Sequence, residues 1–227
     1  LEQVDTSSFL TPGNKILYEI YKDKDGKLWV SAFDVESFII DIRDYIVQKY
    51  PLPDLRNQLK ANPAINSLCK DEDGIFWFSQ DRYGLCIYDS RKEKLKHYSQ
   101  CQGTRNLPFG DVTNIARSYN HNWIWATSYG PTVFGLSQQN MEMKEDVRIE
   151  LGNVTNNPGL ITSLFEDPQN NLWIGTTTGL FVYRIMSATL ESIPEVSGPV
   201  AGITQTADSR IWTVIRNKGI YRIEQDK

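Results

Sequence analysis

Four polar loops, each directly after an apolar segment that contains a Trp, carry the side chains best suited to bind a ligand. Their sequences are SQDRYG (79–84), TSYGPT (127–132), GTTTG (175–179) and VIRNKG (214–219). They combine aromatic, donor and acceptor groups, namely Asp81, Arg82, Tyr83, Tyr129, Arg216, Asn217 and Lys218. Binding residues often lie on loops that a rigid scaffold positions. The mixture suits hydroxyl-rich ligands such as sugars, and an ordinary polar loop is the alternative for any single residue.

The sequence lacks the patterns of known catalytic or metal-binding motifs. Its only His residues are His97 and His121, and neither Gly-x-Ser-x-Gly nor His-Glu-x-x-His occurs. DKDG (23–26) and DEDG (71–74) resemble part of a calcium loop, but the residues that would stand at EF-hand positions 1 and 12 are not acidic. We therefore interpret both as hairpin turns, and we expect a segment without enzymatic activity, bound metal or cofactor.

The charge and the cysteine content of the chain exclude further classes of protein. The net charge is −4 and the pI is near 5.3, which argues against a general nucleic-acid-binding surface. The one dense basic run, RKEKLKHY (91–98), contains Glu93 and is interpreted as a solvated hairpin. The three Cys residues, Cys69, Cys86 and Cys101, form no Cys-x-x-Cys and predict no disulfide framework. Apolar stretches stay short of the roughly 20 residues of a membrane helix, so this segment is not expected to contact a membrane.

The elements that must position these loops repeat along the chain. Trp29, Trp77, Trp125 and Trp173 follow one another at intervals of 48 residues, and Trp212 comes 39 residues later. A fixed period of this length indicates a solenoid, a propeller or an array of repeats.

Each unit reads as four short strands: an apolar strand, an Asp- or Asn-containing turn, the Trp strand, and two further strands after a Gly. Four strands joined by hairpins form one blade of a β-propeller, which predicts an all-β fold of about five four-stranded blades. The blades are expected at residues 15–51, 64–99, 111–151, 160–194 and 199–227. The third unit is shifted by one residue, which indicates one extra residue in its turn.

The Trp strands are apolar on both faces, as in LWV, FWF and LWI, so both faces are expected to be covered. We therefore interpret the five Trp side chains as structural wedges between blades, with ligand stacking as the alternative. Residues 37–50 have helical spacing on their own. In repeat register, however, they align with two strands, which we predict here, joined by a turn at Arg43 and Asp44.

Several phrases match a known repeat family. NLPFGDVTNI, ITSLFEDPQNNLWIGTTTGLFVYR and INSLCKDEDGIFWFSQDRYGLCIYD resemble the two-component regulator propeller repeat. The resemblance covers nearly the whole chain and is strongest in the second and fourth units. It implies the periplasmic sensor domain of a hybrid two-component system histidine kinase, which senses an oligosaccharide and signals across the membrane. The shared residues of the family form blades, so the resemblance transfers no binding residue.

Two other functions compete with a sensor: a propeller enzyme, such as a lyase or glycosidase, and a protein-interaction scaffold. If a glycan binds, we expect it at the loops after the Trp strands and at the blade connections near Arg105 and Phe109. The fifth unit lacks room for an outer strand, and residues 1–14 could supply it or belong to a neighbouring blade. We favour a segment of a larger, seven-bladed propeller. Its uncovered end faces then predict a homodimer.

Overall fold

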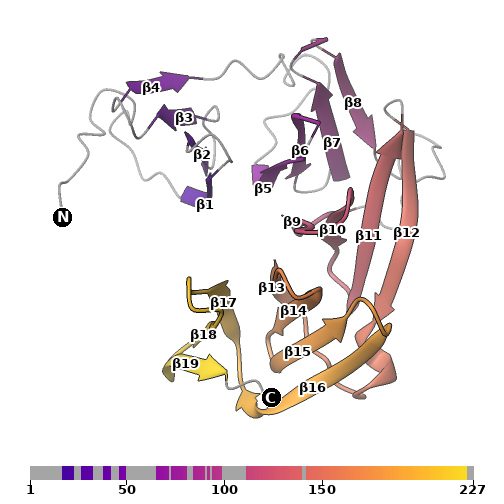
Figure 1. Ribbon diagram of the computed structural model, residues 1–227, viewed down its shortest axis with the longest axis vertical. Coiled ribbons are helices and arrows are strands. Elements are labelled where there is room, and N and C mark those ends of the chain that lie inside the picture. The colour runs from indigo at the N-terminus through magenta and orange to yellow at the C-terminus, as the bar shows by residue number, and fades with distance from the viewer. Residues whose placement is uncertain are drawn as a thin grey trace.

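The computed structural model describes residues 17–22, 27–32, 38–41, 46–49, 65–71, 73–80, 84–89, 91–92, 94–98, 111–139 and 142–223. The described residues form five antiparallel sheets in which the strands neighbour one another in chain order. Four of these sheets have four strands and the last has three. Figure 1 shows them one after another around a common centre, which is the arrangement of propeller blades.

The strands have the following bounds. The first sheet holds β1 (Leu17–Lys22), β2 (Lys27–Ala32), β3 (Phe38–Asp41) and β4 (Ile46–Lys49). The second holds β5 (Ile65–Lys70), β6 (Ile75–Gln80), β7 (Gly84–Asp89) and β8 (Lys94–Tyr98). The third holds β9 (Asn114–Arg117), β10 (Ile124–Thr127), β11 (Thr132–Gln139) and β12 (Glu142–Glu150), followed by the 3₁₀-helix η2 (Leu151–Asn153). The fourth holds β13 (Ile161–Glu166), β14 (Asn171–Thr176), β15 (Gly179–Arg184) and β16 (Thr189–Ser197). The fifth holds β17 (Val200–Gln205), β18 (Ile211–Ile215) and β19 (Gly219–Ile223).

This architecture confirms the predicted all-β propeller. Residues 37–50 contribute β3 and β4 and not a helix, as the repeat register predicts. The fifth sheet has no fourth strand among the described residues. Residues 1–14, the possible outer strand of a neighbouring blade, lie outside the described part of the chain.

Consecutive sheets contact each other through their first two strands. β5 lies against β1 and β2, β9 lies against β5 and β6, and β17 lies against β13 and β14. Side chains of the first strand of one blade donate hydrogen bonds to backbone carbonyls of the first strand of another blade. The Ser67 hydroxyl donates to the Ile115 carbonyl at 3.0 Å, and the Thr162 hydroxyl donates to the Val200 carbonyl at 2.7 Å. These bonds satisfy backbone groups that an edge strand would leave unpaired.

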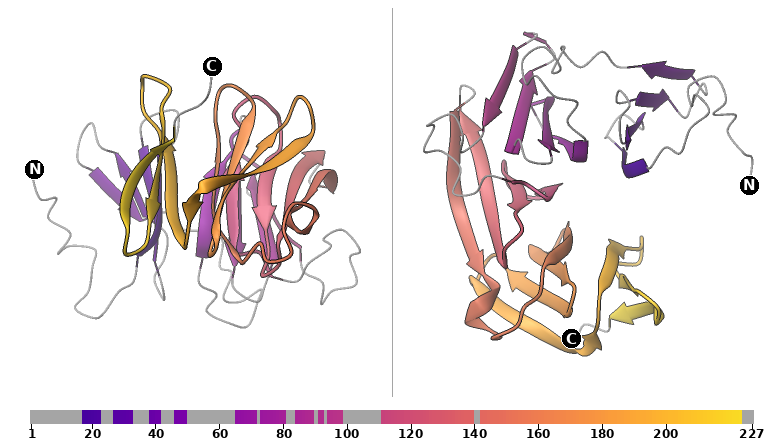
Figure 2. Two further views of the ribbon diagram at one scale, coloured as in Figure 1. Left: turned by 90° about the horizontal axis from the view of Figure 1, so that it is seen from below. Right: turned by 180° about the vertical axis from the view of Figure 1, so that it is seen from behind.

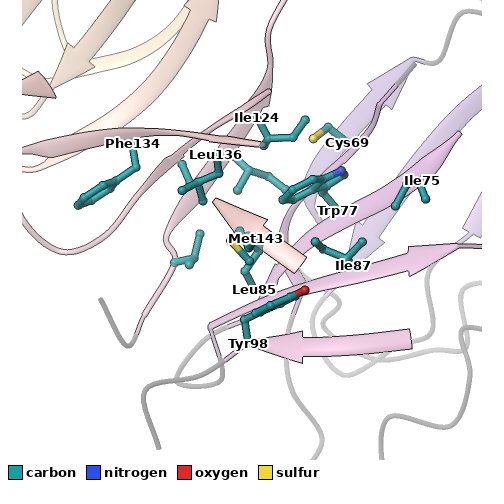
Figure 3. Packing of buried hydrophobic residues seen from close by; sticks show 13 residues of the cluster. Cys69, Ile75, Trp77, Leu85, Ile87, Tyr98, Ile124, Phe134, Leu136 and Met143 are labelled. Atoms are coloured by element: carbon teal, nitrogen blue, oxygen red, sulfur yellow. The ribbon is translucent and has the colours of Figure 1, made fainter. Parts of the chain in front are cut away.

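Large apolar side chains fill the space between the sheets. Trp77 packs in a cluster of both second- and third-blade residues, among them Leu85, Ile124 and Met143 (Figure 3). Trp125 joins Leu172, Ile174 and Phe181 of the fourth blade, and Trp173 joins Val200, Ile211 and Ile215 of the fifth. Each of these three Trp side chains is at most 2% exposed and contacts the blade that follows its own.

The other two Trp residues of the repeat, Trp29 and Trp212, differ from these three. Trp29 lies on β2, and its side chain lies outside the described part. Trp212 is half-buried on the last sheet. The same face of that sheet carries Val214 and Ile220, which pair across β18 and β19 and are 42% and 70% exposed. No described blade covers this face.

Gly175 shows how closely the fourth and fifth blades approach. A Cβ atom at this position would lie 2.3 Å from the Ser163 hydroxyl and 2.5 Å from Cγ1 of Val200. Any larger residue would therefore force the fifth blade away. This contact gives the Gly of the LWIGT phrase a packing role between blades.

The turn between the first two strands sets the position of each Trp strand. In the second blade Lys70 pairs with Phe76, and in the fourth Glu166 pairs with Leu172, which leaves the five-residue turns 71–75 and 167–171. In the third blade Arg117 pairs with Ile124, which leaves the six-residue turn 118–123. The extra residue predicted for the third unit lies in this turn.

Candidate functional site

The loops after the Trp strands lie at the same end of the propeller as the connections between blades. The Thr178 hydroxyl donates to the Pro158 carbonyl at 2.8 Å, and the Gly198 amide donates to the Thr178 carbonyl at 2.9 Å. In the fifth blade the Arg216 amide donates to the Pro199 carbonyl at 2.8 Å. The connections are thus tied to the loops, and we call this end the connection face. Figure 2 shows the strand connections gathered at the two ends of the sheets.

Four of the nine ligand-binding residues predicted from the sequence are described, and all four lie on the connection face. Tyr129 lies in the turn between β10 and β11 of the third blade, and its side chain is 60% exposed. Arg216, Asn217 and Lys218 form the turn between β18 and β19. Asn217 has a φ of 62°, a left-handed conformation that Asn tolerates better than most residues. The other predicted binding residues, Asp81, Arg82, Tyr83, Arg105 and Phe109, lie outside the described residues.

The described groups do not form one compact cluster. Tyr129 belongs to the third blade and Arg216 to the fifth, and the Thr177 and Thr178 loop of the fourth blade stands between them in chain order. The Lys218 ammonium donates to the carbonyl and hydroxyl of Ser197, at 2.8 and 3.1 Å, so it also braces a blade connection. The face thus offers an exposed phenol ring and an exposed guanidinium, groups that can stack on and bond to a hydroxyl-rich ligand of several units.

The opposite end of the sheets, which we call the turn face, carries a pocket that the sequence analysis did not find. Its volume is about 410 Å³. Its charged lining consists of two carboxylates and three cationic side chains: Asp73, Asp89, Arg91, Lys92 and Lys94. Ile75 and Gln138 complete the described lining, and Gln138 comes from β11 of the third blade. The pocket therefore lies where the second blade meets the third.

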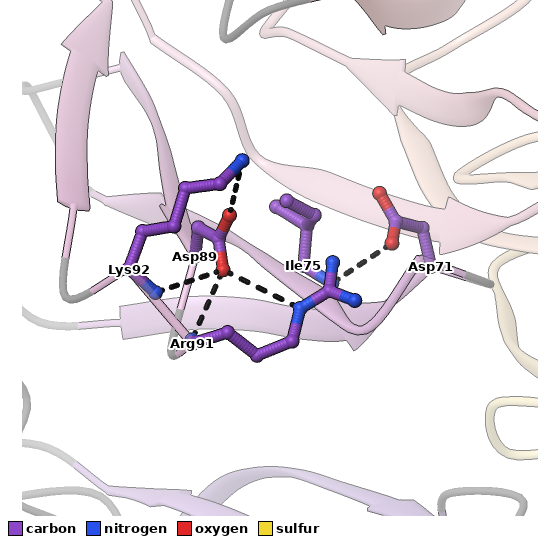
Figure 4. Close-up of polar contacts among 5 residues, drawn as sticks. All are labelled: Asp71, Ile75, Asp89, Arg91 and Lys92. Atoms are coloured by element: carbon purple, nitrogen blue, oxygen red, sulfur yellow. Dashed lines mark hydrogen bonds and ion pairs between the residues drawn. The ribbon is translucent and has the colours of Figure 1, made fainter.

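Asp89 organises the wall of this pocket (Figure 4). It is 1% exposed and ends β7. One carboxylate oxygen, Oδ1, accepts the backbone amides of Arg91 at 3.0 Å and Lys92 at 3.3 Å. The Arg91 Nε lies 3.7 Å from the same oxygen, and the Lys92 ammonium lies 3.3 Å from Oδ2. Burial by itself would raise the pKa of Asp89, but the amide and ammonium hydrogen bonds outweigh it, so the pKa lies below its ordinary value.

The sequence did contain a signal for this pocket: Asp89 stands two residues before the start of the one dense basic run, at Arg91. That run forms the turn between β7 and β8, where Arg91 and Lys92 are exposed, and β8 itself. The predicted solvated hairpin is confirmed, but the prediction did not include the buried Asp89 carboxylate that accepts the backbone amides of this turn. Gln138 could not have been found in this way, because it comes from a different blade.

Other titratable groups, among them Asp71 and Cys86, are buried in the interior of the second blade. Burial raises the pKa of Asp71 above its ordinary value, although hydrogen bonds from the Trp77 indole and the Ile75 amide act in the opposite direction. Burial also raises the pKa of the Cys86 thiol. Cys69 and Cys86 do not form a disulfide, and β6 lies between their strands. Cys101 lies outside the described residues.

The described residues contain no group of three or more His, Cys, Asp or Glu side chains placed to hold a metal ion. They also contain no helix that is both long and apolar enough to cross a membrane.

Comparison with known proteins gives one family match. Residues 157–178 match the model of the two component regulator propeller. The match runs from the connection before the fourth blade to the loop after its Trp strand, so it spans β13 and β14. No curated protein matches the chain.

Solved structures share the fold at low sequence identity. The extracellular domain of a hybrid two component system protein from B. thetaiotaomicron is 18% identical, with a TM-score of 0.69 over all of this chain and 31% of that one. The extracellular domain of a one component system protein from the same organism is 19% identical, with a TM-score of 0.64 over 92% of this chain and 27% of that one. PorZ, a surface component of the type-IX secretion system of Porphyromonas gingivalis, is 13% identical, with a TM-score of 0.62 over 93% of this chain and 32% of that one. The chain thus spans about a third or less of the length of each of these structures.

Proposed function

Because the chain carries the two-component regulator propeller repeat at residues 157–178, we propose that it is an extracytoplasmic sensor module of a hybrid two-component regulator. In this proposal the module lies in the periplasm, binds an oligosaccharide and passes the signal across the membrane to a histidine kinase. The repeat match is the observation that carries the proposal. The fold that the chain shares with extracellular domains of a hybrid two component system and of a one component system supports it.

The connection face is the proposed place of oligosaccharide binding. Tyr129 and Arg216 are exposed there, and the loops that hold them are fixed by backbone hydrogen bonds to the blade connections. Loops held rigidly in this way lose little conformational freedom on binding, which favours affinity. An aromatic ring on the third blade and a guanidinium on the fifth, with the fourth blade between them, suit an extended ligand with many hydroxyl groups.

Two matched pairs of residues test the position of the site. Tyr119 and Tyr129 lie on the same blade and are 59% and 60% exposed, but Tyr119 belongs to the turn face. Arg210 and Arg216 form a second such pair on the fifth blade. We expect Tyr129→Ala and Arg216→Ala to weaken oligosaccharide binding about tenfold, while Tyr119→Ala and Arg210→Ala leave it unchanged.

The binding experiment uses oligomers of hexoses, of pentoses and of uronates, and measures both thermal shift and product release. A thermal shift without hydrolysis or elimination supports a sensor. Release of shorter sugars would show a propeller enzyme instead, and no response to any oligomer would favour a scaffold. Equal losses in both members of a matched pair would contradict the proposed face.

We also propose that the segment forms a homodimer, with the exposed face of the last sheet as the contact. Val214 and Ile220 lie on this face, and the corresponding face of the fourth blade is covered by the fifth. Light scattering should give a mass near twice the 26.0 kDa of one chain, and Ile220→Ser should restore the monomer. A monomer in the unchanged protein at high concentration would contradict the proposal.

A further inference from the structure

The pocket on the turn face has the size of a small-molecule site. Its volume of about 410 Å³ falls within the roughly 300–1,000 Å³ that is usual for ligand pockets. Its lining differs from most such pockets, since Ile75 is the one apolar side chain among the described lining residues. A pocket lined in this way selects a polar ligand.

The charges of the lining do not cancel. Three cationic side chains face two carboxylates, which leaves an excess of one positive charge. Asp89 is already engaged by Arg91 and Lys92, and its lowered pKa keeps it ionised. Lys94, at the start of β8, makes no ion pair with any of the described residues. Its ammonium is therefore the cation in the lining that an anionic ligand can pair with most readily.

The backbone next to this ammonium is held by hydrogen bonds. Asp89 holds the turn after β7 through two backbone amides, so Arg91 and Lys92 start from a fixed backbone. Gln138 closes the pocket from the third blade and supplies an amide, which can both donate to and accept from hydroxyl groups. On the second-blade side Asp73 adds an acceptor for ligand hydroxyls.

We infer that this pocket binds a small polyhydroxylated molecule that carries one carboxylate, such as an acidic monosaccharide. The carboxylate pairs with Lys94 and the Arg91 guanidinium, while Asp73 and Gln138 bond to hydroxyl groups. Carboxylate and guanidinium form strong charge-assisted hydrogen bonds. The site lies at the opposite end of the blades from the connection face, so the inference does not depend on the proposed signalling role.

Calorimetric titration at low ionic strength tests the inference, with glucuronate as the probe and glucose as its neutral counterpart. We expect glucuronate to bind and glucose not to bind. Lys94→Gln should weaken glucuronate binding about tenfold, since a hydrogen bond between charged groups is lost. Arg210→Gln removes the same charge from an exposed turn of the fifth blade and should leave the affinity unchanged.

Further measurements locate the site and separate it from general anion binding. The NMR signals of the Gln138 side-chain amide should shift when glucuronate is added. An unchanged unfolding temperature of Lys94→Gln shows that the loss is not caused by unfolding. Equal binding of glucose, an unchanged affinity in Lys94→Gln, or inorganic sulfate competing as well as glucuronate would each overturn the inference.

Discussion

The third and fourth blades each bury a Trp at the equivalent position, Trp125 and Trp173, but the two indole N–H groups have different kinds of hydrogen-bond acceptor. In the fourth blade Asp167 opens the turn and accepts the Trp173 indole at 2.9 Å from within the same blade. In the third blade Ser118 stands at the corresponding position. Its backbone amide donates a hydrogen bond to the Trp123 carbonyl, as the Asp167 amide does to the Asn171 carbonyl in the fourth blade. The Trp125 indole donates instead to Glu166 of the fourth blade.

The number of acceptor oxygens explains this difference. Asp167 has two: Oδ1 accepts the backbone amides of Gln169 and Asn171, and Oδ2 accepts the Trp173 indole together with the Asn171 side-chain amide. Ser118 has one oxygen, which accepts the amide of His121. A buried indole N–H without an acceptor is costly, so the third blade takes its acceptor from its neighbour. The acceptor that each buried indole needs can therefore come from within its own blade or from the blade across the interface.

The largest expected effect is common to both blades, because packing does not depend on the acceptor. Trp125→Ala and Trp173→Ala should each lower the free energy of unfolding by about 3–5 kcal/mol, as expected when a buried aromatic site is emptied. Trp212→Ala should cost less than half as much, because Trp212 is half-buried on an uncovered face. Urea unfolding measures all three, and equal losses would show that the fifth blade's face is covered in solution.

The second expected effect, the loss of stability when the acceptor of the indole N–H is removed, differs in its location between the two blades. Asp167→Ala and Glu166→Ala should each cost about 1–3 kcal/mol, because each leaves a buried indole donor without its acceptor. Double-mutant cycles with Trp173→Phe and Trp125→Phe, which remove the N–H, should give coupling energies of about 0.5–3 kcal/mol. Ser118→Ala combined with Trp125→Phe is the matched control and should be additive. Coupling in that control cycle would contradict the interblade bond.

The smallest expected effect is the pH dependence of stability in the second blade. Asp71 is the counterpart of Asp167 there, since it accepts the Trp77 indole. Its raised pKa means that the folded state holds the proton more tightly, so its contribution to stability is present below pH 3.8 and is lost as pH rises through the folded-state pKa. Asp89 has a lowered pKa, so its contribution is present above pH 3.8 and is lost as pH falls through the folded-state pKa.

Unfolding measurements on Asp71→Asn and Asp89→Asn from about pH 3 to pH 7 should therefore show opposite trends relative to the unchanged protein. The stability advantage of the unchanged protein over Asp89→Asn should shrink as pH falls below 3.8. Relative to Asp71→Asn, the unchanged protein should lose stability as pH rises above that value. Parallel curves for the two variants would refute this assignment.

Much of the fold could be predicted because it depends on local pattern. The spacing of the Trp residues and the turn residues between apolar runs predict the five sheets, the two strands β3 and β4, and the extra turn residue of the third blade. The candidate sites were less predictable. Tyr129 and Arg216 follow from their position after the Trp strands, whereas the pocket beside Asp89 was read as a solvated hairpin.

The sequence by itself determined the repeat, the order of strands within each blade and the ends at which the loops lie, since hairpin geometry links residues that are close along the chain. Only the tertiary structure decided that Glu166 accepts the indole of Trp125, 41 residues away, and that Gln138 closes a pocket built by the second blade. These contacts join different blades. They depend on how the sheets are packed around the centre, which no local pattern encodes.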